Sequence, residues 1–114
     1  MALNVDIFND KGKPIKNSKG ELVCKNPFPS MPIKFWNDKN DKKFKDAYFD
    51  RFSNTWHHGD FAEIKETGGF VIHGRSDTTL NPGGVRLGTA EIYSEVEKFK
   101  EIKESIVVGQ SWDN

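Results

Sequence analysis

Short runs of alternating apolar and polar residues near the start of the chain predict β-strands. From residue 2 to residue 8, Leu3, Val5 and Ile7 fall on one face, which is the period-two pattern of a half-buried strand. Residues 9–12 contain asparagine, aspartate and glycine, which favour a turn. We therefore expect a hairpin that begins with this strand and bends at this turn.

A second strand is predicted at residues 21–25, after another turn at 17–20 that ends in glycine. Three prolines follow at positions 27, 29 and 32. Because proline has no backbone N–H group to donate to a neighbouring strand, regular sheet pairing is excluded here. This part of the chain is expected to cross the surface as irregular structure.

Residues 38–51 have the composition of a solvent-exposed helix. Nine of these 14 residues are charged, and Phe44, Tyr48 and Phe52 recur at the four-residue spacing of one helix face. Asp41 is placed to cap the N-terminus of the helix. Charge-rich helix faces are usually solvated, so we assign this stretch no function.

A β-hairpin is predicted with strands at 61–66 and 70–73 and a turn at 67–69. It places Asp60 at its entrance and Arg75 at its exit. Antiparallel pairing would bring these side chains, 15 positions apart in sequence, to the same end of the hairpin. A carboxylate and a guanidinium group could then contact one ligand.

The last predicted helix has Thr89 as its N-cap residue. Its buried face is expected to consist of three apolar side chains at helical spacing, Ile92, Val96 and Phe99. Residues 106–108 are Ile-Val-Val and are followed by glycine, a pattern that predicts a strand packed on this helix.

The composition limits the chain to one modest domain. It has 114 residues, of which 35% are hydrophobic and 30% charged, so the core should be small. The 17 basic and 17 acidic residues cancel, which argues against a nucleic-acid partner and against attraction to a membrane by net charge. No N-terminal apolar segment predicts a signal peptide or a spanning helix. With Cys24 as the only cysteine, a disulfide and a paired-cysteine metal site are excluded, and a cytoplasmic location is expected.

Residues 74–92 read as a joint between the hairpin and the last helix. This stretch contains four glycines, one proline and two arginines, Arg75 and Arg86, which are 11 positions apart. Guanidinium groups match phosphate and carboxylate oxygens, and glycine lets backbone N–H groups come close to a ligand. The pattern therefore suits a polyanion, although most stretches of this composition are only turns.

Two motifs in this region resemble those of the adenylate-forming enzymes, the acyl-CoA synthetase and luciferase superfamily. Residues 74–87 (GRSDTTLNPGGVRL) are similar to the hinge motif of that superfamily, and residues 56–61 (WHHGDF) to its ribose-binding Gly-Asp motif. Four further sequence segments are similar to those of one branch of the superfamily, the acetoacetyl-CoA synthetases: ELVC at 21–24, PFPSMP at 27–32, FWND at 35–38 and NPGGVR at 81–86.

The resemblance implies roles for individual residues. Asp60 and Arg75 would hold the ribose of ATP or AMP, since a carboxylate accepts hydrogen bonds from a vicinal diol. Arg86 would reach the nucleotide phosphate and act in catalysis, because a permanent charge stabilises the charge that builds up there. Without the resemblance, Asp60 would be read as a loop carboxylate and each arginine as part of a surface salt bridge.

The same resemblance makes Asp77 the hinge residue, at which the C-terminal domain turns between two arrangements. Gly83 and Gly84 would line the tunnel for coenzyme A, and a tight turn explains them equally well. His57 and His58 depart from the superfamily pattern. Because neighbouring strand residues point to opposite faces, the two could not bind one metal ion, and we predict no metal ligands.

The resemblance implies an α+β fold in which a β-rich hairpin and partial-barrel portion is followed by a hinge and a short βαβ-like segment. Residues 1–76 would be the last part of the large AMP-binding domain. Residues 77–114 would be the hinge and the start of the small mobile C-terminal domain. Superfamily members are several times longer, so a fragment is expected.

The implied function is that of an AMP-forming acetoacetate-CoA ligase, which uses ATP, Mg²⁺ and coenzyme A. The chain has no glycine-rich phosphate-binding loop with its lysine and no catalytic lysine in a Ser-Gly-Lys context, so we expect it to be inactive alone and to bind these ligands weakly or not at all. Two alternatives stay open: a ligase for acetate, propionate or another short acid, and a non-catalytic interaction module. Unpaired strand edges also predict self-association.

Overall fold

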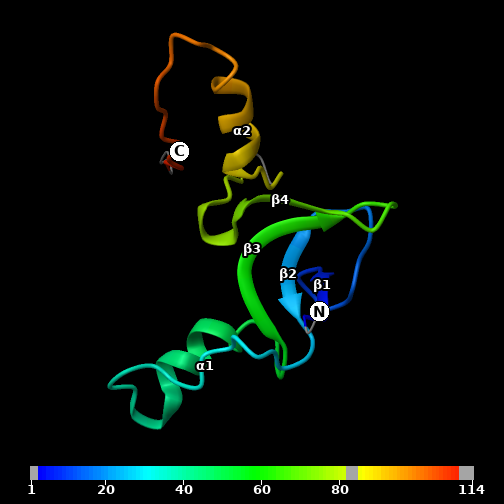
Figure 1. Ribbon diagram of the computed structural model, residues 1–114, viewed down its shortest axis with the longest axis vertical. Helices are drawn as coiled ribbons and strands as arrows, with labels where there is room; N and C mark the ends of the chain where they lie inside the picture. Colours follow the sequence, from blue (N-terminus) through cyan, green and yellow to red (C-terminus); the bar gives the residue numbers. More distant parts are fainter. Residues whose placement is uncertain (1–2, 82–84, 111–114) are drawn as a thin grey trace, which may run out of the picture.

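The computed structural model describes residues 3–81 and 85–110 of the chain. A four-stranded antiparallel sheet with the strand order β1-β2-β3-β4 forms its centre (Figure 1). The strands are β1 (Val5–Phe8), β2 (Gly20–Cys24), β3 (Trp56–Ile64) and β4 (Phe70–Arg75). The helices are α1 (Lys42–Tyr48) and α2 (Thr89–Val96), with short 3-10 turns η1 (Lys39–Asp41) and η2 (Ser76–Thr78). The expected mixture of helix and sheet is confirmed.

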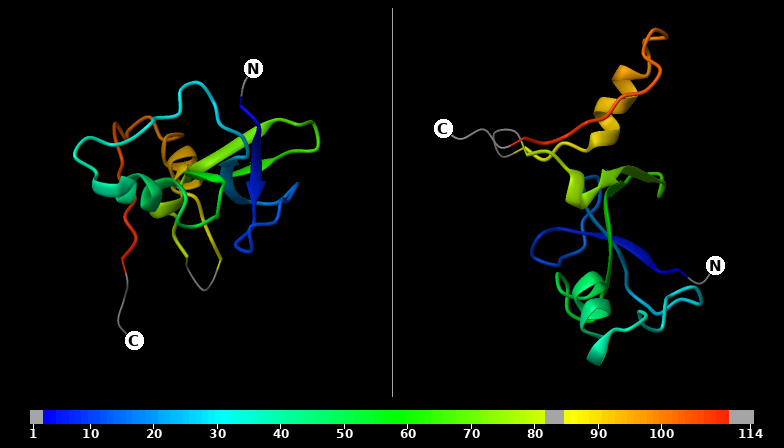
Figure 2. Two further views of the ribbon diagram at one scale, coloured as in Figure 1. Left: turned by 90° about the horizontal axis from the view of Figure 1, so that it is seen from below. Right: turned by 90° about the vertical axis from the view of Figure 1, so that its left-hand side faces the viewer.

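The two helical parts extend from different ends of the sheet. The segment with α1 leaves the sheet at one end and the segment with α2 at the other. The described residues after α2 return alongside it (Figures 1 and 2). Such an open arrangement leaves a small core, made of Ile7, Val23, Cys24, Phe52, Trp56, Phe61 and Ala62. No helix in the described ranges is long and apolar enough to cross a membrane.

The first predicted hairpin is present in a short form. After β1 the chain turns at Asn9, whose backbone N–H donates to the carbonyl of Lys13 over 2.9 Å. Its side-chain oxygen accepts the N–H groups of Lys11 and Lys13, each over 3.0 Å. A bridge between Phe8 and Pro14 follows, before β2 pairs with β1 along its length. The proline-rich stretch 25–38 contains no strand, as predicted.

The helix predicted at 38–51 is shorter, and its predicted cap is wrong. Asp41 has a left-handed backbone conformation (φ 54°) and no capping hydrogen bond. The Asp38 carboxylate instead accepts the backbone N–H groups of Lys43 (2.9 Å) and Phe44 (2.8 Å). The helix ends at Tyr48, so Phe52 lies beyond it. Its buried ring packs edge-on against the ring of Phe8 in β1.

The second hairpin is confirmed, with a longer first strand than predicted. Because β3 begins at Trp56, Asp60 lies inside the strand and pairs directly with Arg75 of β4. The pairing register shifts between Phe61 and Ala62. As a whole, β3 is a strongly curved strand (Figure 1). A bulge of this kind re-aims side chains on the bent strand.

Three expectations for the C-terminal part are wrong. Gly88 precedes the first turn of α2 and donates its N–H to the Glu91 side chain (3.1 Å), while the predicted cap, Thr89, is buried against Gly74 of β4. Phe99 lies beyond the end of α2 and is 61% exposed. No strand forms at 106–108, where the backbone N–H of Val107 donates to the hydroxyl of Tyr93 in α2.

We predict that Gly20→Ala strongly destabilises the chain. A Cβ atom at Gly20 would lie 2.5 Å from the carbonyl oxygen of Phe8 and 2.9 Å from Cγ2 of Ile7, so β1 and β2 would have to separate. The free energy of unfolding should fall by about 2 kcal/mol or more. Gly69→Ala is the matched control, since the nearest atom, on Thr67, is 3.7 Å away and the change should stay within about 0.5 kcal/mol. Equal urea midpoints for the two variants would contradict this packing.

Candidate functional site

The antiparallel register of β3 and β4 brings Asp60 and Arg75 together, as the sequence predicts. Nη1 of Arg75 lies 3.5 Å from Oδ1 of Asp60 and donates to the carbonyl of His58 over 3.3 Å. Nε of Arg75 lies 3.3 Å from Oδ1 of Asp77. Asp77 is the first residue of the linker, residues 77–88, which connects the sheet to α2. These distances are long for charge-assisted hydrogen bonds, so both carboxylates keep the capacity to accept hydrogen bonds from a ligand.

Gly59 allows the Arg75 side chain to lie flat across β3. Its φ angle is +85°, and a Cβ atom there would lie 2.7 Å from Nη2 of Arg75. Any other residue would therefore be strained and would push the guanidinium group away from Asp60. The Gly-Asp pair in the sequence thus has a structural meaning: the glycine makes room for the arginine that the aspartate faces.

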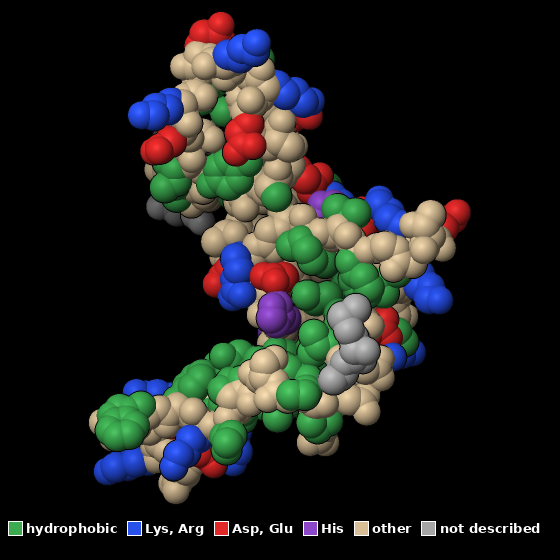
Figure 3. Space-filling model, viewed as in Figure 1, with side chains coloured by type: hydrophobic (Ala, Val, Ile, Leu, Met, Phe, Trp, Pro, Cys, Tyr) green, Lys and Arg blue, Asp and Glu red, His purple; other side chains and the backbone are tan. Residues whose placement is uncertain are grey.

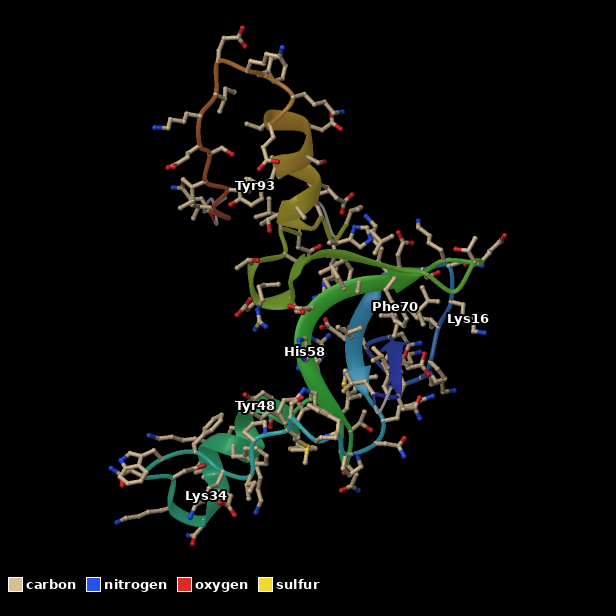
Figure 4. The ribbon with its side chains drawn as sticks, in the orientation of Figure 1. Lys16, Lys34, Tyr48, His58, Phe70 and Tyr93 are labelled. Atoms are coloured by element: carbon tan, nitrogen blue, oxygen red, sulfur yellow. The ribbon has the colours of Figure 1, made fainter. Side chains whose placement is uncertain are left out.

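A cavity of about 600 Å³ opens beside this pair. Its wall includes Tyr48, Arg51, His58, Arg75 and Asp77, together with the edge of Trp56 and the backbone at Gly59. In the space-filling view, histidine, acidic and basic side chains gather at the back of the hollow between the two helical parts (Figure 3). His58 and Tyr48 mark its middle and lower end (Figure 4). The Tyr48 ring stacks on the indole of Trp56 with centroids 3.7 Å apart.

A buried carboxylate, Glu21 of β2, lies behind this cavity and joins several elements. Oε1 lies 2.9 Å from Nη1 of Arg51 and 3.0 Å from Nη2 of Arg86. Neither contact is a well-directed hydrogen bond, so both are ion pairs. Oε2 lies 2.9 Å from Nε2 of His57 and accepts a hydrogen bond from the hydroxyl of Ser76. The Glu21 side chain has no exposed surface.

The charges around Glu21 hold it ionised. Burial alone would raise the pKa of its carboxyl group, but the hydrogen bonds of His57 and Ser76 and the charges of Arg51 and Arg86 outweigh burial and lower the pKa to about 2. Since the folded pKa lies below the ordinary value of 4.5, the ionised group stabilises the fold above about pH 4.5. That contribution is lost as the pH falls toward 2.

Arg86 is therefore placed on Glu21 and not directly on the cavity wall near Arg75. Its guanidinium carbon lies 4.5 Å from the centre of the Phe61 ring, a cation–π contact, and Nη2 lies 3.4 Å from Oγ1 of Thr79. Two of the predicted site residues, Arg75 and Asp77, thus line the cavity, and Asp60 lies beside it, against Arg75. Arg86 joins them through Glu21, whose partners His57, Ser76 and Arg51 line the same cavity.

Sequence reasoning missed Glu21 and Arg51. Arg51 is the last residue of the stretch 38–51, which was predicted to be a solvent-exposed helix. Its guanidinium group nevertheless bridges Glu21 and Asp10, the latter over 2.7 Å. His57 and His58 contact different carboxylates, Glu21 and Asp60. The sequence of β2 gave no signal for a buried Glu21, because this is the single charged residue of the strand and a glutamate in a strand usually faces solvent.

A second polar cluster holds α2 on the sheet. His73 of β4 is 7% exposed, and its ring nitrogens lie 3.1 Å from Glu63 of β3 and 3.5 Å from Glu91 of α2. Lys19 contacts Glu91 over 2.7 Å and Lys65 contacts Glu63 over 2.6 Å. Hydrogen bonding to Lys65 and Lys19, respectively, is the main reason that the pKa values of Glu63 and Glu91 are lowered.

The predicted coenzyme A contacts, Gly83 and Gly84, lie outside the described residues. Within the ranges 3–81 and 85–110, no group of three or more histidine, cysteine, aspartate or glutamate residues is arranged to hold a metal ion.

Comparisons with known proteins agree on one family. No protein-family model matches the chain. The acetoacetyl-coenzyme A synthetase of Rhizobium meliloti (strain 1021) is 60% identical over 114 residues, which are 100% of this chain and 18% of that protein. The acetoacetyl-CoA synthetase of Gallus gallus is 50% identical over 111 residues, 96% of this chain and 17% of that protein.

Solved structures give the same result. The acetoacetyl-CoA synthetase from Streptomyces lividans matches with a TM-score of 0.89 and 47% identity, over 94% of this chain and 16% of that one. An anthranilate CoA ligase in complex with anthranoyl-AMP matches with a TM-score of 0.73 at 19% identity, over 90% of this chain and 19% of that one, which shows a shared fold. By sequence and by fold, the chain resembles an internal segment of the acetoacetyl-CoA synthetases, and it spans less than a fifth of the length of the relatives that it matches.

Proposed function

We propose that this chain supplies the ribose-binding and hinge part of an AMP-forming acetoacetate-CoA ligase. The complete reaction converts acetoacetate, ATP and coenzyme A to acetoacetyl-CoA, AMP and pyrophosphate. The chain covers only 16% to 18% of the length of these relatives. The proposal therefore concerns a segment that works together with other parts of a ligase. We expect the 114-residue chain to have no ligase activity alone, because its sequence has neither the phosphate loop nor the catalytic lysine of the family.

The observation that carries the proposal is the pairing of Asp60 with Arg75, whose side chain lines the cavity. The Asp60 side chain is 22% exposed and that of Arg75 54% exposed, so both are open to a ligand without being free in solvent. The two acceptor oxygens of Asp60 fit the 2′ and 3′ hydroxyl groups of a ribose. The donors of Arg75 fix the direction of that carboxylate and remain able to contact the sugar.

Arg86 is proposed to face the nucleotide phosphate. Its permanent charge would stabilise the charge that accumulates on the phosphate during transfer. The guanidinium group is 29% exposed and lies against the Phe61 ring, in a partly desolvated place where charge interactions are stronger than in water. Mg²⁺ would neutralise the remaining phosphate charge, with ligands from outside this chain.

Residues 77–114 are proposed to form the hinge and the start of a mobile domain, and residues 1–76 the end of the nucleotide-binding domain. Asp77 lies in η2, directly after β4, and its carboxylate is 68% exposed. Glu91 of α2 contacts His73 of β4 and Lys19, which precedes β2, and these polar contacts support this boundary. In the Lys19–Glu91 pair both side chains are about one-third exposed, and ion pairs of this exposure contribute little, which suits an interface that must separate.

Two further expectations concern partners and location. Phe70, Val71 and Ile72 of the edge strand β4 are 45%, 37% and 49% exposed, which supports self-association of the chain through this edge. Burial raises the pKa of the single cysteine, Cys24, so the thiol stays protonated and unreactive. We propose the cytoplasm as the location of the protein.

The direct test is a chimaeric ligase, in which this chain replaces the matching segment of the Rhizobium meliloti enzyme. We predict that the chimaera forms acetoacetyl-CoA and that Asp60→Asn raises its KM for ATP by about tenfold or more, because an amide offers one acceptor where the ribose needs two. Asp46→Asn on the exposed face of α1 is the control and should change nothing. An inactive chimaera that folds, or an unchanged KM in Asp60→Asn, would reject the proposal.

In the same chimaera, Asp77→Pro tests the hinge. Proline fixes φ near −65° and restricts the preceding residue, so one of the two domain arrangements should be lost. We expect pyrophosphate exchange and thioester formation, measured separately, to lose only one of the two rates. Asp77→Ala removes the same carboxylate but keeps backbone freedom, and it should retain both steps. If Asp77→Pro leaves both rates near wild type, the hinge lies elsewhere.

A further inference from the structure

We propose that Glu21 is a positioning residue, which holds the Arg86 guanidinium group in the arrangement used for adenylation. This inference rests on the proposed role of Arg86 at the phosphate. It assigns a function to a buried strand carboxylate that touches no substrate itself.

The geometry around Glu21 leads to this proposal. Its carboxylate has no exposed surface, and Oε1 lies 3.0 Å from Nη2 of Arg86. A charge buried to this extent is costly unless it is paired, so the position of Arg86 is tied to that of β2. Phe61 of β3 supports the flat side of the same guanidinium group with its ring, 4.5 Å from the guanidinium carbon. Two strands of the rigid sheet therefore fix a side chain that belongs to the linker.

Glu21 contacts the chain on both sides of the proposed hinge. Ser76 immediately precedes Asp77 and donates its hydroxyl hydrogen to Oε2, whereas Arg86 follows Asp77 by nine residues and pairs with Oε1. If the part after Asp77 turns, the Ser76 contact can remain while the Arg86 contact must break. The Glu21–Arg86 pair thus belongs to one hinge arrangement, and loss of Glu21 should affect the half-reaction that uses this arrangement.

Arg51 fixes the carboxylate from a third direction. It pairs with Oε1 of Glu21 over 2.9 Å and with Asp10 over 2.7 Å, and both contacts lie before the hinge in the sequence. When Arg86 leaves, Arg51 and Ser76 still compensate the buried charge. The site can therefore release Arg86 without leaving an isolated carboxylate in the core.

The test is a double-mutant cycle in the chimaeric ligase. Glu21→Gln keeps the shape of the side chain and removes its charge. We expect it to slow pyrophosphate exchange by about tenfold or more, because the ion pair that positions Arg86 is lost, while thioester formation from preformed adenylate stays within about twofold. In the Arg86→Ala background the same substitution should add less than about threefold, because its effect passes through Arg86.

Glu63→Gln is the matched control. Glu63 is another largely buried carboxylate of the sheet, paired with His73 and Lys65 and without contact to Arg86. It should destabilise the fold without separating the two half-reactions and without coupling to Arg86→Ala. Thermal melting of all variants shows whether Glu21→Gln is folded. If it is not, Glu21→Asp, which keeps the charge one methylene farther away, replaces it in the cycle and should show the same coupling.

The outcomes separate this inference from the function on which it rests. If Arg86→Ala slows exchange but Glu21→Gln slows it equally with and without Arg86, Glu21 acts independently and the positioning role is wrong. If both half-reactions fall together in Glu21→Gln, its role is structural and the inference is also overturned. If Arg86→Ala leaves exchange unchanged, the proposed role of Arg86 fails first, and the inference fails with it.

Discussion

The pairing of the buried Glu21 carboxylate is the constraint on which the rest of the structure depends. An ionised carboxylate without exposed surface is tolerated only where charges and hydrogen-bond donors surround it, and here Arg51, His57, Ser76 and Arg86 do so. These four residues come from the loop before β3, from β3 itself, from η2 and from the linker. One carboxylate therefore aligns the wall of the cavity with the linker that follows it.

The Asp60–Arg75 pair depends on backbone geometry instead. Asp60 and Arg75 are direct partners in the β3–β4 register, and the positive φ of Gly59 leaves the space into which the guanidinium group fits. Because the pair is built on two hydrogen-bonded strands, its separation does not depend on long flexible loops. Asp77 lies at the end of the same strand, so motion at that point would start next to a rigid site. This arrangement suits the proposed hinge, because one domain could move without disturbing the proposed ribose contacts.

Local patterns in the sequence predicted much of this fold. The hairpin and the meeting of Asp60 with Arg75 followed from a turn signal and from antiparallel pairing, both of which involve residues close in sequence. The Glu21 cluster joins positions 30 to 65 residues apart, from Arg51 to Arg86, and no local pattern reports such contacts. The strand predicted at 106–108 failed for a related reason, since β-branched residues form a strand only beside a partner strand.

Helix ends were predicted less well, because several side chains competed for the same role. Asp38 and Asp41 both precede α1, and only the earlier one has the extended backbone that directs its carboxylate at the free N–H groups. At α2, Thr89 is drawn into the contact with Gly74, and the Glu91 side chain accepts the N–H of Gly88 instead. Packing against the sheet decided the second case, and the sequence carries no local sign of it.

The most direct test of the central role of Glu21 is a titration of its side-chain carboxyl carbon by ¹³C NMR in the folded 114-residue chain. The described contacts predict a pKa of about 2, well below the ordinary value of 4.5. The resonance should therefore stay constant from pH 7 to about pH 4 and shift only at lower pH, and Arg86→Ala should move the midpoint upward. A midpoint near 4.5 would show that the carboxylate is not held by these four partners and would contradict the account.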